Sequence, residues 1–110
     1  MRELAVEQNG LLLEHIEEQT ERICKLAVKQ DGLSLKFVKE QTDEICILAV
    51  QQNGYALRFV KKQNYPICFF AYSQNKDSIQ YVQMEKLTSE EQTNFRLRLS
   101  CDDIMFKWKN

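Results

Sequence analysis

The stretch Gln41–Phe70, QTDEICILAVQQNGYALRFVKKQNYPICFF, decides the fold because it nearly overlays the sequence that lies 22 residues earlier. The same residue types keep recurring with this spacing along the chain. An internal repeat of this strength fixes the architecture before any single motif does. The residues in phase include Cys24, Cys46 and Cys68, together with Gly10, Gly32 and Gly54.

We therefore divide the 110-residue chain into a repeat region, residues 1–92, and a C-terminal cap, residues 93–110. The repeat region comprises a partial opening helix at 1–4 and four units at 5–26, 27–48, 49–70 and, in degenerate form, 71–92.

Each unit is predicted to contain two short helices. The first starts after Thr20 or Thr42, since a threonine hydroxyl can accept from an unpaired amide at a helix start. It ends before Gly54 or its counterparts, which we interpret as left-handed helix stops. The second helix is expected at about Tyr55–Lys62. An Asn-Gly hairpin turn is rejected because the flanking apolar residues follow helical spacing.

Stacking of the units is required for stability. A unit of 22 residues buries too few apolar side chains to offset the entropy lost when it is ordered. Repeats of this size gain their core by packing on their neighbours. The sequence therefore predicts an all-α fold, a short α-solenoid of tandem helix–turn–helix repeats with a divergent C-terminal cap.

The two ends of the chain differ from the repeats. The opening helix has neither the threonine cap nor a polar outer face, which suggests that it contacts a partner or belongs to a longer array. Near the other end, Thr88…Glu91 and Ser89…Gln92 fit a capping box. Residues 95–99 and 104–108 alternate in polarity, however, so a terminal β-hairpin competes with the helix that we favour.

The repeated pattern AVxQNGxxLxFV…QTxEIC resembles a tandem helical-repeat family known only as a domain of unknown function, of the 4116 type. The resemblance covers residues 1–82 and fails over 84–110. The departures are Asp31, Lys76, His15 and Asn64–Pro66. The resemblance implies helical repeats and a binding role, and it supplies no catalytic residues.

Composition restricts the location and the chemistry. The formal charge of −1 gives no overall attraction to nucleic acid, and no apolar run is long enough to cross a membrane. Cysteines that recur inside apolar stretches are expected to be buried free thiols in a reducing compartment, so a cytoplasmic location is predicted.

No constellation of catalytic residues stands out, so we expect no enzyme activity, no metal and no cofactor. The only histidine, His15, occupies the repeat position of Phe37, Phe59 and Tyr81. We interpret it as a ring packed at the edge of a repeat.

Two sets of variable outer positions are candidate contact sites. Five cations on the second helices form a basic ladder that could steer a partner, although a merely solvated face explains them equally well. Ile47 and Phe69 on the first helices, where an earlier unit has Lys25, form either an exposed apolar anchor or ordinary core. The ladder residues are Lys36, Lys39, Arg58, Lys61 and Lys62.

A constant framework with variable outer positions favours a non-enzymatic protein–protein interaction module. A narrower hypothesis is a small viral or mobile-element protein that binds and blocks a host protein. The alternatives are nucleic-acid binding through the basic ladder and self-association through the uncapped first repeat, which predicts an assembly that dissociates when Leu4 or Val6 becomes charged.

Overall fold

The computed structural model describes residues 2–99, and every regular element within this range is helical. An α-helix followed by a 3-10 helix forms one pair, and the pairs succeed one another along the chain. They are α1 (Arg2–Gln8) with η1 (Gly10–His15), α2 (Glu21–Gln30) with η2 (Gly32–Phe37), α3 (Asp43–Gln52) with η3 (Gly54–Phe59), and α4 (Tyr65–Gln74) with η4 (Lys76–Tyr81), here called pairs 1 to 4. The predicted all-α repeat fold is confirmed.

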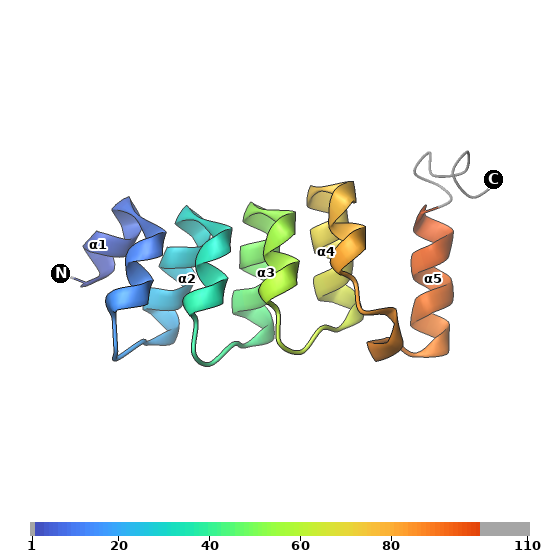
Figure 1. Cartoon of the computed structure of the whole chain (residues 1–110), viewed down its shortest axis with the longest axis horizontal. Helices are drawn as coiled ribbons and strands as arrows, with labels where there is room; N and C mark the ends of the chain where they lie inside the picture. The colour runs from blue at the N-terminus through green and yellow to red at the C-terminus, as the bar shows by residue number, and fades with distance from the viewer. Residues whose placement is uncertain (1, 100–110) are drawn as a thin grey trace.

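The four pairs stand side by side in a row, with α1 at one end and the last helix, α5 (Ser89–Leu99), at the other (Figure 1). Each α-helix from α1 to α3 packs on the α-helix of the next pair, and each 3-10 helix from η1 to η3 packs on that of the next pair, so the row has two layers. The chain measures 53 × 23 × 15 Å. Its radius of gyration, 15.2 Å, exceeds the roughly 13 Å of a compact chain of this length.

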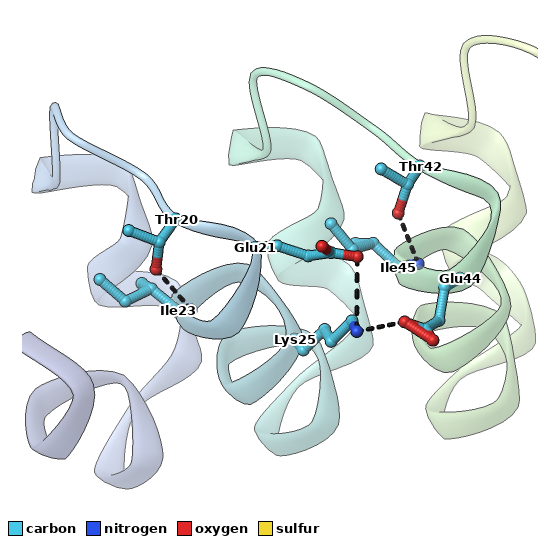
Figure 2. Close-up of polar contacts among 7 residues, drawn as sticks. All are labelled: Thr20, Glu21, Ile23, Lys25, Thr42, Glu44 and Ile45. Atoms are coloured by element: carbon cyan, nitrogen blue, oxygen red, sulfur yellow. Dashed lines mark hydrogen bonds and ion pairs between the residues drawn. The ribbon is translucent and has the colours of Figure 1, made fainter.

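The α-helices of pairs 2 to 4 begin as the sequence predicts. Thr20 Oγ1 accepts a hydrogen bond from Ile23 N at 3.1 Å, and the same cap recurs one unit later between Thr42 and Ile45 at 3.2 Å (Figure 2). In pair 4 the Oδ1 atom of Asn64 performs this role, with a proline in the first turn. The predicted unit limits at 26/27, 48/49 and 70/71 fall inside α2, α3 and α4. Each structural pair therefore starts and ends at other residues than the predicted unit.

The second helix of each unit differs from the prediction. Instead of a helix over Tyr55–Lys62, the structure has the 3-10 helix η3, which ends at Phe59. Val60 is already extended, because the chain must turn back to start the next pair. Short connecting pieces of this kind commonly adopt the tighter 3-10 form.

The interpretation of the glycines as left-handed helix stops is wrong. The residue that ends α3 is Asn53, with φ −152° and ψ 111°, and its side chain also caps η3 by accepting from Tyr55 N. Gly54 follows inside η3 and is fully covered. The repeated glycine therefore has another cause.

That cause is the close approach of the next pair. A β-carbon on Gly32 would lie 2.4 Å from Ala49 O, a separation that real β-carbons essentially never show. Gly10 and Gly54 meet the carbonyl oxygens of Ala27 and Ala71 in the same way. In pair 4 the position is Lys76, which is tolerated because no further α–η pair follows it within the described residues.

Glutamine side chains form hydrogen bonds between each pair and the next. Gln52 Oε1 accepts from Gly32 N at 2.5 Å, so the end of α3 holds the start of η2. Gln41 reaches forward: its Nε2 donates to Phe59 O and its Oε1 accepts from Lys61 N, both at 2.9 Å. The equivalent glutamines, Gln30, Gln74, Gln19 and Gln63, make equivalent bonds at the other junctions.

The C-terminal end of the row is covered by α5. Thr88 and Glu91 form the predicted capping box, each accepting from the other's backbone amide. Phe95 is buried, and its ring meets those of Tyr65 and Tyr72 at centroid distances of 6.0 and 5.7 Å. The hairpin alternative is wrong for residues 95–99, which lie in α5, while its second half at 104–108 lies outside the described residues.

Replacing Gly32 by alanine should lower the free energy of unfolding by about 1–3 kcal/mol, the usual cost of overpacking. The added methyl group can be accommodated only if η2 separates from α3. Urea denaturation measures this change. Lys76→Ala, at the same repeat position, serves as the control and should have a smaller effect, and equal losses would refute the close-approach explanation.

Candidate functional site

Two of the predicted ladder cations, Lys36 and Arg58, lie among aromatic rings on the layer of 3-10 helices. Both side chains are exposed. Lys36 Nζ lies 5.0 Å from the centroid of Phe37 and 6.0 Å from that of Phe59 in the next pair. Each cation therefore bridges two neighbouring pairs, an interaction worth about 0.5–1 kcal/mol at an exposed site.

Arg58 repeats this arrangement one pair further along. Its guanidinium carbon lies 5.2 Å from the centroid of Phe59 and 5.6 Å from that of Tyr81. Cations and half-buried rings thus alternate along η2, η3 and η4. We call this set the cation–aromatic row; it comprises Lys36, Phe37, Arg58, Phe59 and Tyr81.

The other ladder residues lie elsewhere, in the segments that connect one pair to the next. Lys39 Nζ donates to Glu17 O at 3.1 Å, and Lys61 Nζ donates to Lys39 O at 3.5 Å. Lys62 is exposed and lines a hollow of about 230 Å³ that also touches Cys46. The five predicted cations therefore form two groups, and Lys39 and Lys61 link adjacent pairs as well as adding charge.

The second predicted site, Ile47 with Phe69, is half-buried in the α layer. Ile47 packs against the core, and Phe69 stacks on Tyr65 with a centroid distance of 6.3 Å. At the equivalent position in pair 2, Lys25 bonds to Glu44 of the next pair and lies 3.4 Å from Glu21 (Figure 2). Glu44, followed by Glu21, raises the pKa of Lys25.

His15 departs from its predicted packing. Its side chain is 75% exposed and lies 3.9 Å from Glu14. In pairs 3 and 4 the ring at this position lies under a cation of the preceding pair: Phe59 under Lys36 and Tyr81 under Arg58. No pair precedes η1 in the described part of the chain, so the imidazole lacks such a neighbour.

The outward face of pair 1 is apolar. Leu4, Leu11 and Leu12 are 56%, 41% and 38% exposed, whereas Val6 is fully buried. The prediction that a charge at Leu4 or Val6 would dissociate an assembly is therefore corrected for Val6. A charge at this buried position would disturb the core of the chain itself. The later residues at the position of Leu12 are small and completely buried: Ser34, Ala56 and Ser78.

A hollow of about 550 Å³ lies where the connecting segments of pairs 1 and 2 meet. Four carboxylates line it, together with Lys39 and the threonines that cap α2 and α3. They are Glu17, Glu18, Glu21 and Glu40. Among the side chains of residues 4–97, no group of three or more His, Cys, Asp or Glu could hold a metal ion. No helix within residues 2–99 is long and apolar enough to cross a membrane.

Three cysteines are buried free thiols, and the sequence did not reveal their polar contact. Cys46 Sγ lies 3.5 Å from Oε1 of Gln41, the same oxygen that accepts from Lys61 N. The glutamine that recurs five residues before each of these cysteines was the available signal, since Gln19 and Gln63 hold Cys24 and Cys68 similarly. The thiol thus belongs to the junction between pairs.

Residues 20–64, which contain α2, η2, α3 and η3, match one family model. It is that of the domain of unknown function DUF4116. The resemblance predicted from the repeated motifs is confirmed over this segment, which includes Lys36 and Arg58. No curated protein and no solved structure matches the chain. The match to DUF4116 therefore agrees with the repeat fold. It names no function, so the function has to be inferred from the surface.

The buried thiols should resist modification and make stability fall in alkali. Burial, and then the charge of Glu91, raises the pKa of Cys68 to about 12, and burial followed by Asp43 raises that of Cys46 to about 11. Unfolded thiols ionise near pH 9, so their contribution to stability is complete below that pH and is lost toward pH 11–12. At pH 8 these three thiols should react slowly with Ellman's reagent in the folded protein.

Urea denaturation as a function of pH measures this loss, in a Cys101→Ser background so that the three repeat cysteines remain. The control is Cys68→Ala, whose stability should fall less steeply between pH 9 and pH 12. Equal slopes for the two proteins would contradict the assignment.

Proposed function

We propose that the chain is a non-enzymatic protein-binding repeat module whose contact surface is the cation–aromatic row. The observation that carries the proposal is a contrast between positions. The glycines, alanine carbonyls and glutamines at the junctions recur, while the exposed position on the 3-10 helices varies from Glu14 to Lys36, Arg58 and Gln80. Side chains that are free to vary on a rigid array are the ones that can adapt to a partner.

The charges of the row are expected to affect the rate of association and the choice of partner more than the affinity. Exposed charges mainly accelerate encounter and select among partners, and half-buried aromatic rings beside them add contact area. Phe37, Phe59 and Tyr81 provide such rings. The narrower hypothesis, a viral or mobile-element protein that blocks a host protein, would use the same surface.

A lysate pull-down tests the module. Reversing Lys36 and Arg58, the two cations of the row, to glutamate should abolish capture of proteins that the wild type enriches, because the partner would then meet repulsion. The matched control reverses two exposed cations on other surfaces, Lys29 and Arg96, and should capture the same proteins as the wild type. Identical protein lists for all three baits would overturn the proposal.

Nucleic acid is the competing ligand, and the same baits distinguish it. Capture that depends on the row and disappears after nuclease treatment would replace the protein partner by nucleic acid. A control salt titration should then show affinity falling steeply with ionic strength, by a log–log slope of about −0.9 per phosphate contacted.

Self-association is a second candidate, favoured by the exposed leucines of pair 1. Leu26, Leu48 and Phe70 occupy the position of Leu4 in later pairs and pack against the core. A second copy of the chain could cover the exposed Leu4, Leu11 and Leu12 of pair 1 by an apolar contact. This contact would leave the cation–aromatic row free.

Light scattering over a range of concentrations tests the self-association. The wild type should gain mass as concentration rises, and Leu4→Glu should keep the monomer mass throughout. Leu97→Glu, a charge placed at an equally exposed leucine on α5, is the control and should behave as the wild type. A wild type that stays monomeric at every concentration would rule the candidate out.

A further inference from the structure

We infer that the cation–aromatic row binds an acidic peptide segment, with the carboxylates of the segment on Lys36 and Arg58. The inference rests on the proposed function and specifies the chemistry of the partner at the same surface. It depends on four features of the row: the pairing of its cations, the occupation of its ring faces, the charges at its two ends, and the preorganisation of its side chains.

The cations of the row have no carboxylate partner among the described residues. Among the side chains of residues 4–97, the contacts of Lys36 and Arg58 are with ring faces and none is an ion pair. Lys25 provides the contrast, since it pairs with both Glu21 and Glu44. The N–H groups of Lys36 and Arg58 that point away from the rings remain available to the oxygens of a ligand.

Each aromatic ring of the row already has a cation over it. Lys36 lies over Phe37 and Phe59, and Arg58 over Phe59 and Tyr81. Proteins that bind single-stranded nucleic acid use open aromatic faces on which bases stack. The row therefore offers hydrogen-bond donors and leaves less of its ring faces open for stacking, which favours carboxylates over nucleobases.

Both ends of the row carry negative charge. Glu14 occupies the position of Lys36 in pair 1, and Asp77 in η4 accepts from the hydroxyl of Tyr55 at 3.3 Å. A long polyanion such as nucleic acid would extend past the cations and meet these carboxylates. A short acidic segment can place its charges on Lys36 and Arg58 alone.

The row is also preorganised. Each cation is held between the rings of two neighbouring pairs, and the pairs are fixed to one another by the glutamine hydrogen bonds. Binding therefore immobilises fewer freely rotating side chains than a set of isolated surface lysines would require. Two charged contacts of this kind correspond to roughly a tenfold gain in affinity over an uncharged ligand.

Fluorescence anisotropy with short labelled peptides tests the inference. A peptide of alternating Glu and Ala should bind the wild type about tenfold more tightly than the same peptide with Gln in place of Glu. The double variant Lys36→Met, Arg58→Met keeps the apolar stems and should lose this preference. The control Lys29→Met, Arg96→Met removes the same charge from other surfaces and should retain it.

Each alternative outcome overturns the inference. Equal losses in the two double variants would show that net charge alone decides, and tighter binding of a labelled oligothymidylate than of the Glu peptide would make the ligand a nucleic acid. Lys36→Arg, Arg58→Lys should restore the preference if the charges act directly. Circular dichroism and the urea midpoint establish that each variant is folded.

The two experiments separate this inference from the proposed function. If the lysate pull-down returns a protein that depends on the row while the Glu peptide shows no preference over the Gln peptide, the module stands and the acidic chemistry fails. If neither experiment shows a dependence on Lys36 and Arg58, both proposals fail.

Discussion

The repeat is built around the contact between a glycine and the backbone of the following pair. At Gly32 the separation leaves no room for a β-carbon beside Ala49 O, and Gly10 and Gly54 are equally close to their neighbours. The glycine amide is then satisfied by a glutamine side chain of the following α-helix, as Gln52 does for Gly32. A buried polar group left without a partner costs about 1–3 kcal/mol, so the glycine and the glutamine depend on each other.

The spacing of the repeat predicted much of the fold, because helix starts and apolar positions are local properties. The caps at Thr20 and Thr42 and the capping box at Thr88 are confirmed, and Asn64 caps α4 in place of a threonine. The role of the glycine was missed for a physical reason. A left-handed helix end and a tight contact both select glycine, and only the position of the next pair distinguishes them.

The surface was harder to predict than the fold. Lys36 and Lys39 are three residues apart and appear equivalent on an α-helix, but η2 ends at Phe37 and the chain turns before Lys39. The first lysine consequently joins the aromatic rings, and the second bonds to the backbone of the preceding connecting segment. A sequence pattern assigns residues to a face only if the type of helix is known.

The junctions between pairs have a consequence for how such chains change in length. Gln41 contacts residues 18 and 20 positions ahead, and Gln52 contacts one 20 positions behind, so every bond at a junction is made between adjacent copies. An interior copy could be duplicated or deleted in frame, and the copies on either side would meet through the same set of bonds. The copy with Leu12 lacks the small side chain that an interior copy has at this position. The copy with Lys76 lacks the glycine that lets the next pair approach. Tandem duplication of pair 2 or pair 3 would therefore give a longer array with intact junctions, whereas duplication of pair 1 or pair 4 would not.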